Sequence, residues 1–111
     1  MGRGYLTQLL KGNTDVLILS LLQKEAMYGH QIMENLEAVS GGVLNLSEGT
    51  LYPALHRLVR EGLIEGRWAR LPNGKERKLY SLTRKGQGWL SDCLSTWGTF
   101  AHAMTQVTSQ A

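Results

Sequence analysis

The stretch "NLSEGTLYPALHRLVREGLI", Asn45–Ile64, decides the fold that the rest of the chain has to accommodate. Its apolar residues recur at intervals of three and four, which is the spacing of a helix with one apolar face: Leu51, Leu55, Leu58 and Val59. One glycine and one proline interrupt an otherwise regular pattern. The stretch therefore predicts an amphipathic helix with an unusual first half.

The two interruptions inside this helix are Gly49 and Pro53. A proline in a helix interior costs about 3 kcal/mol, but the cost is lower near the helix start. A glycine in the first turn lets the backbone approach a ligand closely. Since Ser47 is a favourable N-cap and Gly62 a favourable terminator, we predict a helix between them with its N-terminal end available for docking. Whether Pro53 kinks the helix, or the helix begins later than Ser47, stays open at this point.

Elements on both sides of this helix follow from the same kind of pattern. Apolar periodicity, caps and glycines predict further helices, and Pro72-Asn73-Gly74 is a strong signal for the turn of a two-stranded hairpin. The predicted elements are helices at 14–25 and 28–40, strands at 64–70 and 77–82, and a final helix at 83–104. This order is typical of a mainly α (α+β) fold, the winged helix-turn-helix. We expect an N-terminal DNA-binding domain over residues 1–82 and a C-terminal dimerisation helix and tail over residues 83–111.

Charge is concentrated in one part of the chain. The 111 residues carry a net charge of +3, yet the segment from His56 to Lys85 holds nine Lys or Arg against three Glu. Such a basic segment favours an anionic partner, nucleic acid first, although a solvated surface is the alternative. A single cysteine, Cys93, and the lack of a signal peptide or membrane-spanning run predict a cytoplasmic protein with no membrane association.

Three motifs in order resemble the PadR family of bacterial transcriptional repressors. They are "MYGHQIMENLE", "LSEGTLYPALHRLVREGLIEG" and "RKLYSLTRKG". The resemblance covers roughly residues 14–88 and implies that the third helix enters the major groove while the hairpin reaches DNA backbone or minor groove. It implies a double-stranded operator, read as a pseudo-palindrome by two recognition helices about one helical turn apart.

The short C-terminal part resembles the short branch of this family, which includes the lactococcal multidrug-resistance repressor. In that branch the last helices of two subunits pair, and a tryptophan from each lines an apolar pore for planar, drug-like molecules. Independently, the final helix carries a 4-3-4-3 apolar stripe that is typical of a helix packed along a partner helix. The predicted homodimer contacts are Leu90, Leu94, Trp97, Ala101 and Met104. The implied effector, planar and apolar or cationic, would contact Trp97, Leu94 and Ala101, although ordinary interface packing also accounts for Trp97.

The candidate DNA contacts come from the second helix, the third helix and the hairpin. They are Tyr28, Ser47, Thr50, Leu51, Tyr52, His56, Arg57, Lys75, Arg77 and Lys78. The alternatives are structural roles for the two tyrosines, a surface charge for Arg57 and a solvated hairpin tip for the last three. No catalytic constellation, metal-ligand spacing or cofactor motif is recognisable, so we expect a regulator rather than an enzyme, with no metal or cofactor. The rival function is a winged-helix adaptor that binds a protein instead of DNA.

Overall fold

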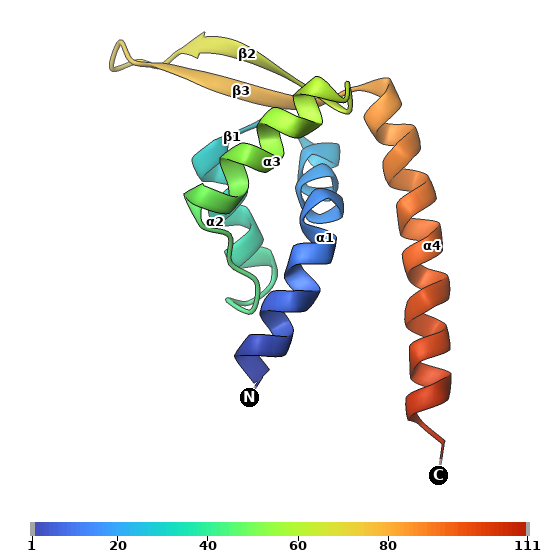
Figure 1. Cartoon of the computed structure of the whole chain (residues 1–111). Coiled ribbons are helices and arrows are strands. Elements are labelled where there is room, and N and C mark those ends of the chain that lie inside the picture. The colour runs from blue at the N-terminus through green and yellow to red at the C-terminus, as the bar shows by residue number, and fades with distance from the viewer. Residues whose placement is uncertain (1, 111) are drawn as a thin grey trace.

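The computed structural model describes residues 2–110 and has the predicted winged-helix architecture (Figure 1). Three helices form a compact body, a β-hairpin projects across it as the wing, and a long last helix descends beside the body. The elements are α1 (Gly2–Lys24), β1 (Met27–Tyr28), α2 (Gly29–Val39), α3 (Glu48–Arg60), β2 (Ile64–Arg70), β3 (Glu76–Leu82) and α4 (Arg84–Thr108).

The first helix is much longer than predicted. We expected a start near residue 14, whereas α1 already begins at Gly2. Asn13, which precedes the predicted start, lies inside the helix and donates its side-chain amide to the Leu9 carbonyl at 2.7 Å. Thr14 likewise donates its hydroxyl to the Leu10 carbonyl at 2.9 Å. Both polar side chains bond back to the preceding turn, so they continue the helix instead of capping it.

A short strand between α1 and α2 was missed. Met27 and Tyr28 form β1, which pairs antiparallel with β3 and gives a three-stranded sheet in the order β1-β3-β2. Two residues are too few to show the alternation that identifies a strand in sequence. Tyr28 is also the N-cap of α2, and its backbone amide donates to the Gln31 side chain at 2.9 Å.

The helix α3 confirms the helix predicted from the opening stretch and settles where that helix begins. Its N-cap is Ser47, so the helix does not begin later, and Pro53 lies inside it. Gly62 follows the helix with a φ of 78°, a backbone conformation that favours glycine. One face is buried in the body and consists of Leu51, Ala54, Leu55 and Leu58.

The hydrophobic core joins all parts of the fold. Its fully buried large side chains are Ile18, Leu19, Ile32, Leu51, Leu55, Leu58, Ile64 and Leu90. They come from α1, α2, α3, β2 and α4, so the first turns of α4 belong to the same core as the body. The predicted division at 82/83 coincides with the change from β3 to α4; its end residues Met1 and Ala111 lie outside the described residues.

The wing is a regular antiparallel hairpin. Its register runs from Ile64 opposite Leu82 to Arg70 opposite Glu76, so β3 begins one residue earlier than predicted. The predicted turn is confirmed: Gly74 has a φ of 84°, and the Asn73 side chain accepts the backbone amide of Lys75 at 3.0 Å.

The start of the last helix is fixed to the body by hydrogen bonds and close packing. The Thr83 hydroxyl accepts the backbone amide of Gly86 at 3.0 Å and donates to the Gly62 carbonyl at 2.7 Å. Gly86 packs so closely that an added Cβ would lie 1.9 Å from the Leu63 carbonyl oxygen. Beyond these turns α4 extends away and continues past the predicted end at residue 104. Within residues 2–110, no helix combines the length and apolar character needed to cross a membrane.

Candidate nucleic-acid interface

The beginning of α3 presents polar groups to solvent. Ser47, Glu48, Gly49 and Thr50 are all exposed. The Ser47 hydroxyl donates to the Thr50 hydroxyl at 3.2 Å and makes no cap bond to the helix backbone. The first amides of a helix have no partner within the helix and attract anions. The start of α3 therefore offers both hydroxyls and backbone donors to a partner.

Leu51 was wrongly included among the DNA-contacting residues. Its side chain is 0% exposed and belongs to the core cluster. It lies four residues before Leu55 and seven before Leu58, on the face of α3 that packs into the body. Its role is to anchor the helix, while the neighbouring Thr50 and the half-buried Tyr52 flank that buried face.

Arg57 is engaged within the protein. Its two terminal nitrogens bond the two carboxylate oxygens of Asp15 in α1 at 2.8 and 2.6 Å, and one of them also bonds Glu61 at 3.1 Å. The hydrogen bonds to Asp15 and the two carboxylate charges raise the pKa of Arg57 above its usual value. The bidentate pair joins residues 42 positions apart in sequence, so no local pattern predicts it. It ties the exposed flank of α3 to the middle of α1.

A cleft between α3 and the wing brings several predicted residues together. Tyr28 at the start of α2, Tyr52 and His56 of α3, and Arg77 and Lys78 of β3 all line one hollow of about 730 Å³. These side chains come from three parts of the sequence, and the sheet places them around one space because β1 and β3 are neighbouring strands.

Seven further residues of the cleft were not predicted, His30 and Trp68 among them. His30 lines it and its ring stacks on Tyr28, with ring centroids 6.0 Å apart and planes at 2°. Trp68 of β2 lines it from the wing side. The signal that existed for Trp68 was the alternation of β2, which places it on the same strand face as the buried Ile64.

The wing carries most of the exposed positive charge near this cleft. Arg70, Lys75 and Arg77 are exposed at its outer end, and Arg67 is exposed beside Glu65, with which it forms an ion pair at 3.2 Å. The start of α3 and the tip of the wing lie on the same side of the molecule (Figure 1). The geometry thus presents a helix end and a basic hairpin to a single partner.

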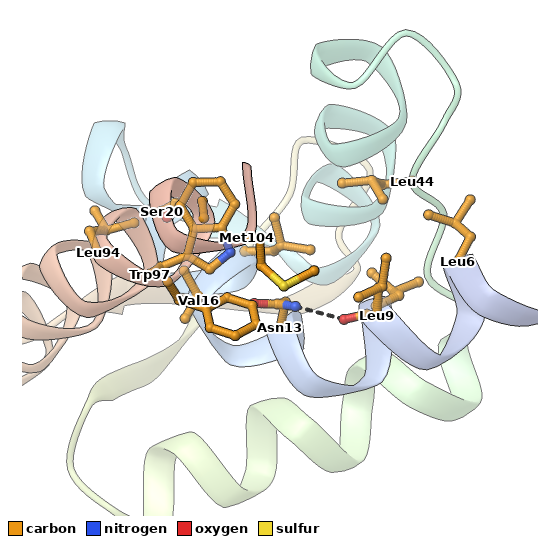
Figure 2. A pocket seen from close by; sticks show the side chains of 13 residues that line it. Leu6, Leu9, Asn13, Val16, Ser20, Leu44, Leu94, Trp97 and Met104 are labelled. Carbon is orange, nitrogen blue, oxygen red and sulfur yellow. Dashed lines mark hydrogen bonds between the residues drawn. The ribbon is translucent and has the colours of Figure 1, made fainter. Parts of the chain in front are cut away.

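A second, apolar groove lies between α1 and α4 (Figure 2). It has a volume of about 580 Å³ and contains the predicted dimer and effector residues Leu94, Trp97, Ala101 and Met104. Trp97 is 52% exposed and Phe100 60% exposed, so large apolar side chains face solvent in this chain. Side chains of both helices face the same hollow in Figure 2.

The structure corrects the predicted dimer contacts in two respects. Leu90 was expected at the dimer contact, yet its side chain is 0% exposed and lies in the core, because the first turns of α4 pack on the body. The α1 side of the groove was missed, since the sequence pattern did not extend α1 toward the N-terminus. The contributions from α1 are Leu6, Leu9, Leu10, Asn13, Val16, Leu17 and Ser20.

Comparison with known proteins places this geometry in context. Residues 18–92 match the transcriptional regulator PadR-like family, a class of regulators and not of enzymes. A PadR family transcriptional regulator from Eggerthella lenta superimposes with a TM-score of 0.86 at 27% identity, covering 98% of this chain and 93% of that one. A PadR-like regulator from Bacillus cereus gives 0.82 at 32% identity, covering 94% and 99%.

A third similar structure is Bacillus subtilis PadR in complex with operator DNA. It matches at 31% identity with a TM-score of 0.68 and covers 73% of this chain but 47% of that one. The shared part is thus a minor fraction of that longer protein.

Proposed function

Because this chain belongs to the PadR-like family of transcriptional regulators, we propose that it is a repressor that binds operator DNA through α3 and the wing. A similar protein, Bacillus subtilis PadR, has been solved with operator DNA. In this arrangement the start of α3 enters the major groove and the wing contacts the adjacent backbone or minor groove. The observation that carries the proposal is the placement of the exposed α3 start and the basic wing on one side of the molecule.

Each group of residues has a distinct part in this proposal. Ser47, Thr50 and His56 are exposed on α3 and contribute hydroxyl and imidazole contacts to base edges or backbone. Tyr28 and Tyr52 are half-buried, so their rings pack in the body while their hydroxyls reach phosphates. The wing cations that neutralise phosphates are Lys75, Arg77 and Lys78.

The apolar groove supports a homodimer. Leu94, Trp97 and Met104 are exposed along one side of α4, and α1 adds Leu9 beside them. Contiguous exposed apolar surface marks an interaction site, and a second copy of the chain offers a matching stripe. A two-fold dimer presents two α3 helices to a pseudo-palindromic operator.

We extend the proposal to an effector in the manner of the short branch of the family. Trp97 offers a broad ring face in the middle of the groove, and Ala101 beside it is small. A tryptophan face stacks on planar and cationic aromatic molecules. Such a ligand between two subunits shifts the population of dimer shapes that differ in the spacing of the α3 helices.

The test of DNA binding is anisotropy of a labelled duplex from upstream of the gene, titrated at several salt concentrations. Log affinity falls with log salt by about 0.9 per phosphate contact. The triple variant Lys75→Gln, Arg77→Gln and Lys78→Gln is expected to lower affinity about 100-fold at moderate salt and to reduce the slope by about 2 to 3. Because these contacts are to phosphates, the loss should be similar on unrelated duplexes.

A matched control removes the same net charge at the far end of the molecule. Ser95→Glu, His102→Glu and Gln106→Glu place three negative charges on exposed positions of α4 and should leave the salt slope unchanged. No binding by the parent protein at low salt, or binding without salt dependence, would contradict the proposal. An adaptor that binds a protein partner instead would keep its complex in the wing variant.

A further inference from the structure

Trp68 is a large aromatic residue on the wing that is 69% exposed. It lies on β2 at an even spacing from Gly66 and Ile64, and Ile64 is buried in the core. Side chains at alternate positions of a strand share one face. Trp68 therefore projects from the wing toward the body and into the cleft that it lines with α3.

Lys78 and Trp68 face each other across the hairpin. They are register partners, and the Lys78 ammonium lies 5.5 Å from the centroid of the indole ring. The aliphatic part of Lys78 also covers Gly66, where an added Cβ would lie 3.1 Å from the lysine Cδ. The lysine is thus laid along the strand face beside the ring, and its charge is held within the cleft.

The opposite wall of the cleft is also aromatic. It consists of the stacked Tyr28 and His30, together with Tyr52 and His56. The charged residues that line the cleft are Arg77 and Lys78 with Glu48 and Glu76, so its formal charge is balanced. Electrostatic attraction to a net charge therefore does not determine which kind of ligand the cleft binds. Ring faces beside two cations suit the backbone of a DNA duplex, which alternates deoxyribose rings with phosphates.

We propose that Trp68 is a DNA-contacting residue, with the indole packed on the sugar-phosphate strand that runs through the cleft between α3 and the wing. Lys78 then binds a phosphate of that strand from its place over the ring. This inference rests on the proposed operator binding, and it adds a contact of a different kind from the charged wing tip. A duplex whose major groove holds α3 carries one backbone strand past the wing, which is where the cleft lies.

The experiment follows tryptophan emission and DNA anisotropy on the same samples. Titration of the parent with the upstream duplex should change the emission, and the change should saturate at the affinity that anisotropy gives. In Trp68→Phe that emission change should disappear although the duplex still binds. Trp89→Phe, a substitution at a tryptophan that does not line the cleft, should keep the change.

Affinity provides the second readout. Trp68→Ala should weaken duplex binding about tenfold, and Trp68→Phe about threefold, since a smaller ring keeps part of the packing. The exposure of Trp68 makes both variants compatible with folding, which circular dichroism and the thermal midpoint check. If the emission change persists in Trp68→Phe, or Trp68→Ala binds as tightly as the parent, Trp68 is not a contact and the wing-tip proposal stands alone. If the parent does not bind the duplex in the anisotropy measurement, operator binding itself is overturned.

Discussion

The apolar groove between α1 and α4 and the cleft between α3 and the wing are both partly aromatic, yet they suit opposite partners. Among the described residues, 2–110, those that line the groove are all uncharged. Asn13 and Ser20 are the polar ones. The cleft combines four charged residues and two histidines with its rings. Apolar surface left in water costs about 25 cal/mol per Å², whereas a charged cleft is well hydrated. The groove therefore favours another apolar surface, whereas the cleft, with balanced charge and several rings, favours a partner that combines ring or sugar surfaces with charged groups.

The two regions share one helix. Residues between Leu6 and Ser20 of α1 line the groove, and Asp15 in the middle of the same helix holds Arg57 of α3 through two hydrogen bonds. Movement of α1 against α4 therefore bears directly on the helix that we assign to the major groove. This gives the effector proposal a physical route from groove to α3.

The largest effect is expected from a charge placed in the apolar groove between α1 and α4. Phe100→Asp should raise the dimer dissociation constant at least 100-fold, because an unpaired carboxylate would be removed from water. Phe100 is 60% exposed in the single chain, so folding should be retained. Sedimentation velocity measures the dimer, and operator affinity should fall with it. Gln106→Asp on the exposed opposite side of α4 is the control, and a Phe100→Asp variant that stays dimeric would exclude this groove as the interface.

Binding of a planar dye tests whether Trp97 in the groove is part of an effector site. A planar cationic dye should quench tryptophan emission of the parent, and Trp97→Ala should weaken dye binding at least tenfold because the stacking face is lost. Trp89→Ala is the matched control, since Trp89 also lies on α4 but does not line the groove. Equal quenching in Trp97→Ala and the parent would remove Trp97 from the effector site.

Substitution of Asp15, the ion-pair partner of Arg57, should change operator affinity. The direction of that change distinguishes two roles of Arg57. If Arg57 positions α3, Asp15→Asn should weaken operator binding about fivefold and leave the salt slope unchanged. If Arg57 is instead a phosphate contact restrained by Asp15, the same substitution should strengthen binding and increase the slope by about 0.9. Glu61→Gln removes the second, solvent-exposed partner and should change affinity less than twofold.

The sequence was sufficient for the parts of the fold with local signals. Ser47 and Gly62 bounded α3, and Asn73-Gly74 located the hairpin turn. It failed where the information is not local. A 4-3-4-3 stripe cannot show that Leu90 packs in its own subunit while Leu94 is exposed, because both positions have the same periodicity.

The candidate site shows the same division. Thr50 and His56 were predicted as DNA contacts, a role that requires exposed side chains, and both are exposed. Leu51 was misassigned because the docking motif and the buried stripe overlap at that position. Arg57 and Trp68 acquire their surroundings from residues brought near by tertiary structure, namely Asp15 and the far wall of the cleft.

The smallest expected effect is at Thr83, the residue between β3 of the wing and α4. Its hydroxyl caps α4 through Gly86 and also bonds the Gly62 carbonyl after α3. Thr83→Ala should lower the free energy of unfolding by about 1 kcal/mol, as loss of an N-cap does, and Thr83→Ser should restore most of it. Urea unfolding should show a lower midpoint with an unchanged slope, because Leu90 makes the start of α4 part of the common core. A second transition in Thr83→Ala would instead mean that α4 unfolds separately, and that the groove and the cleft belong to two cooperative units.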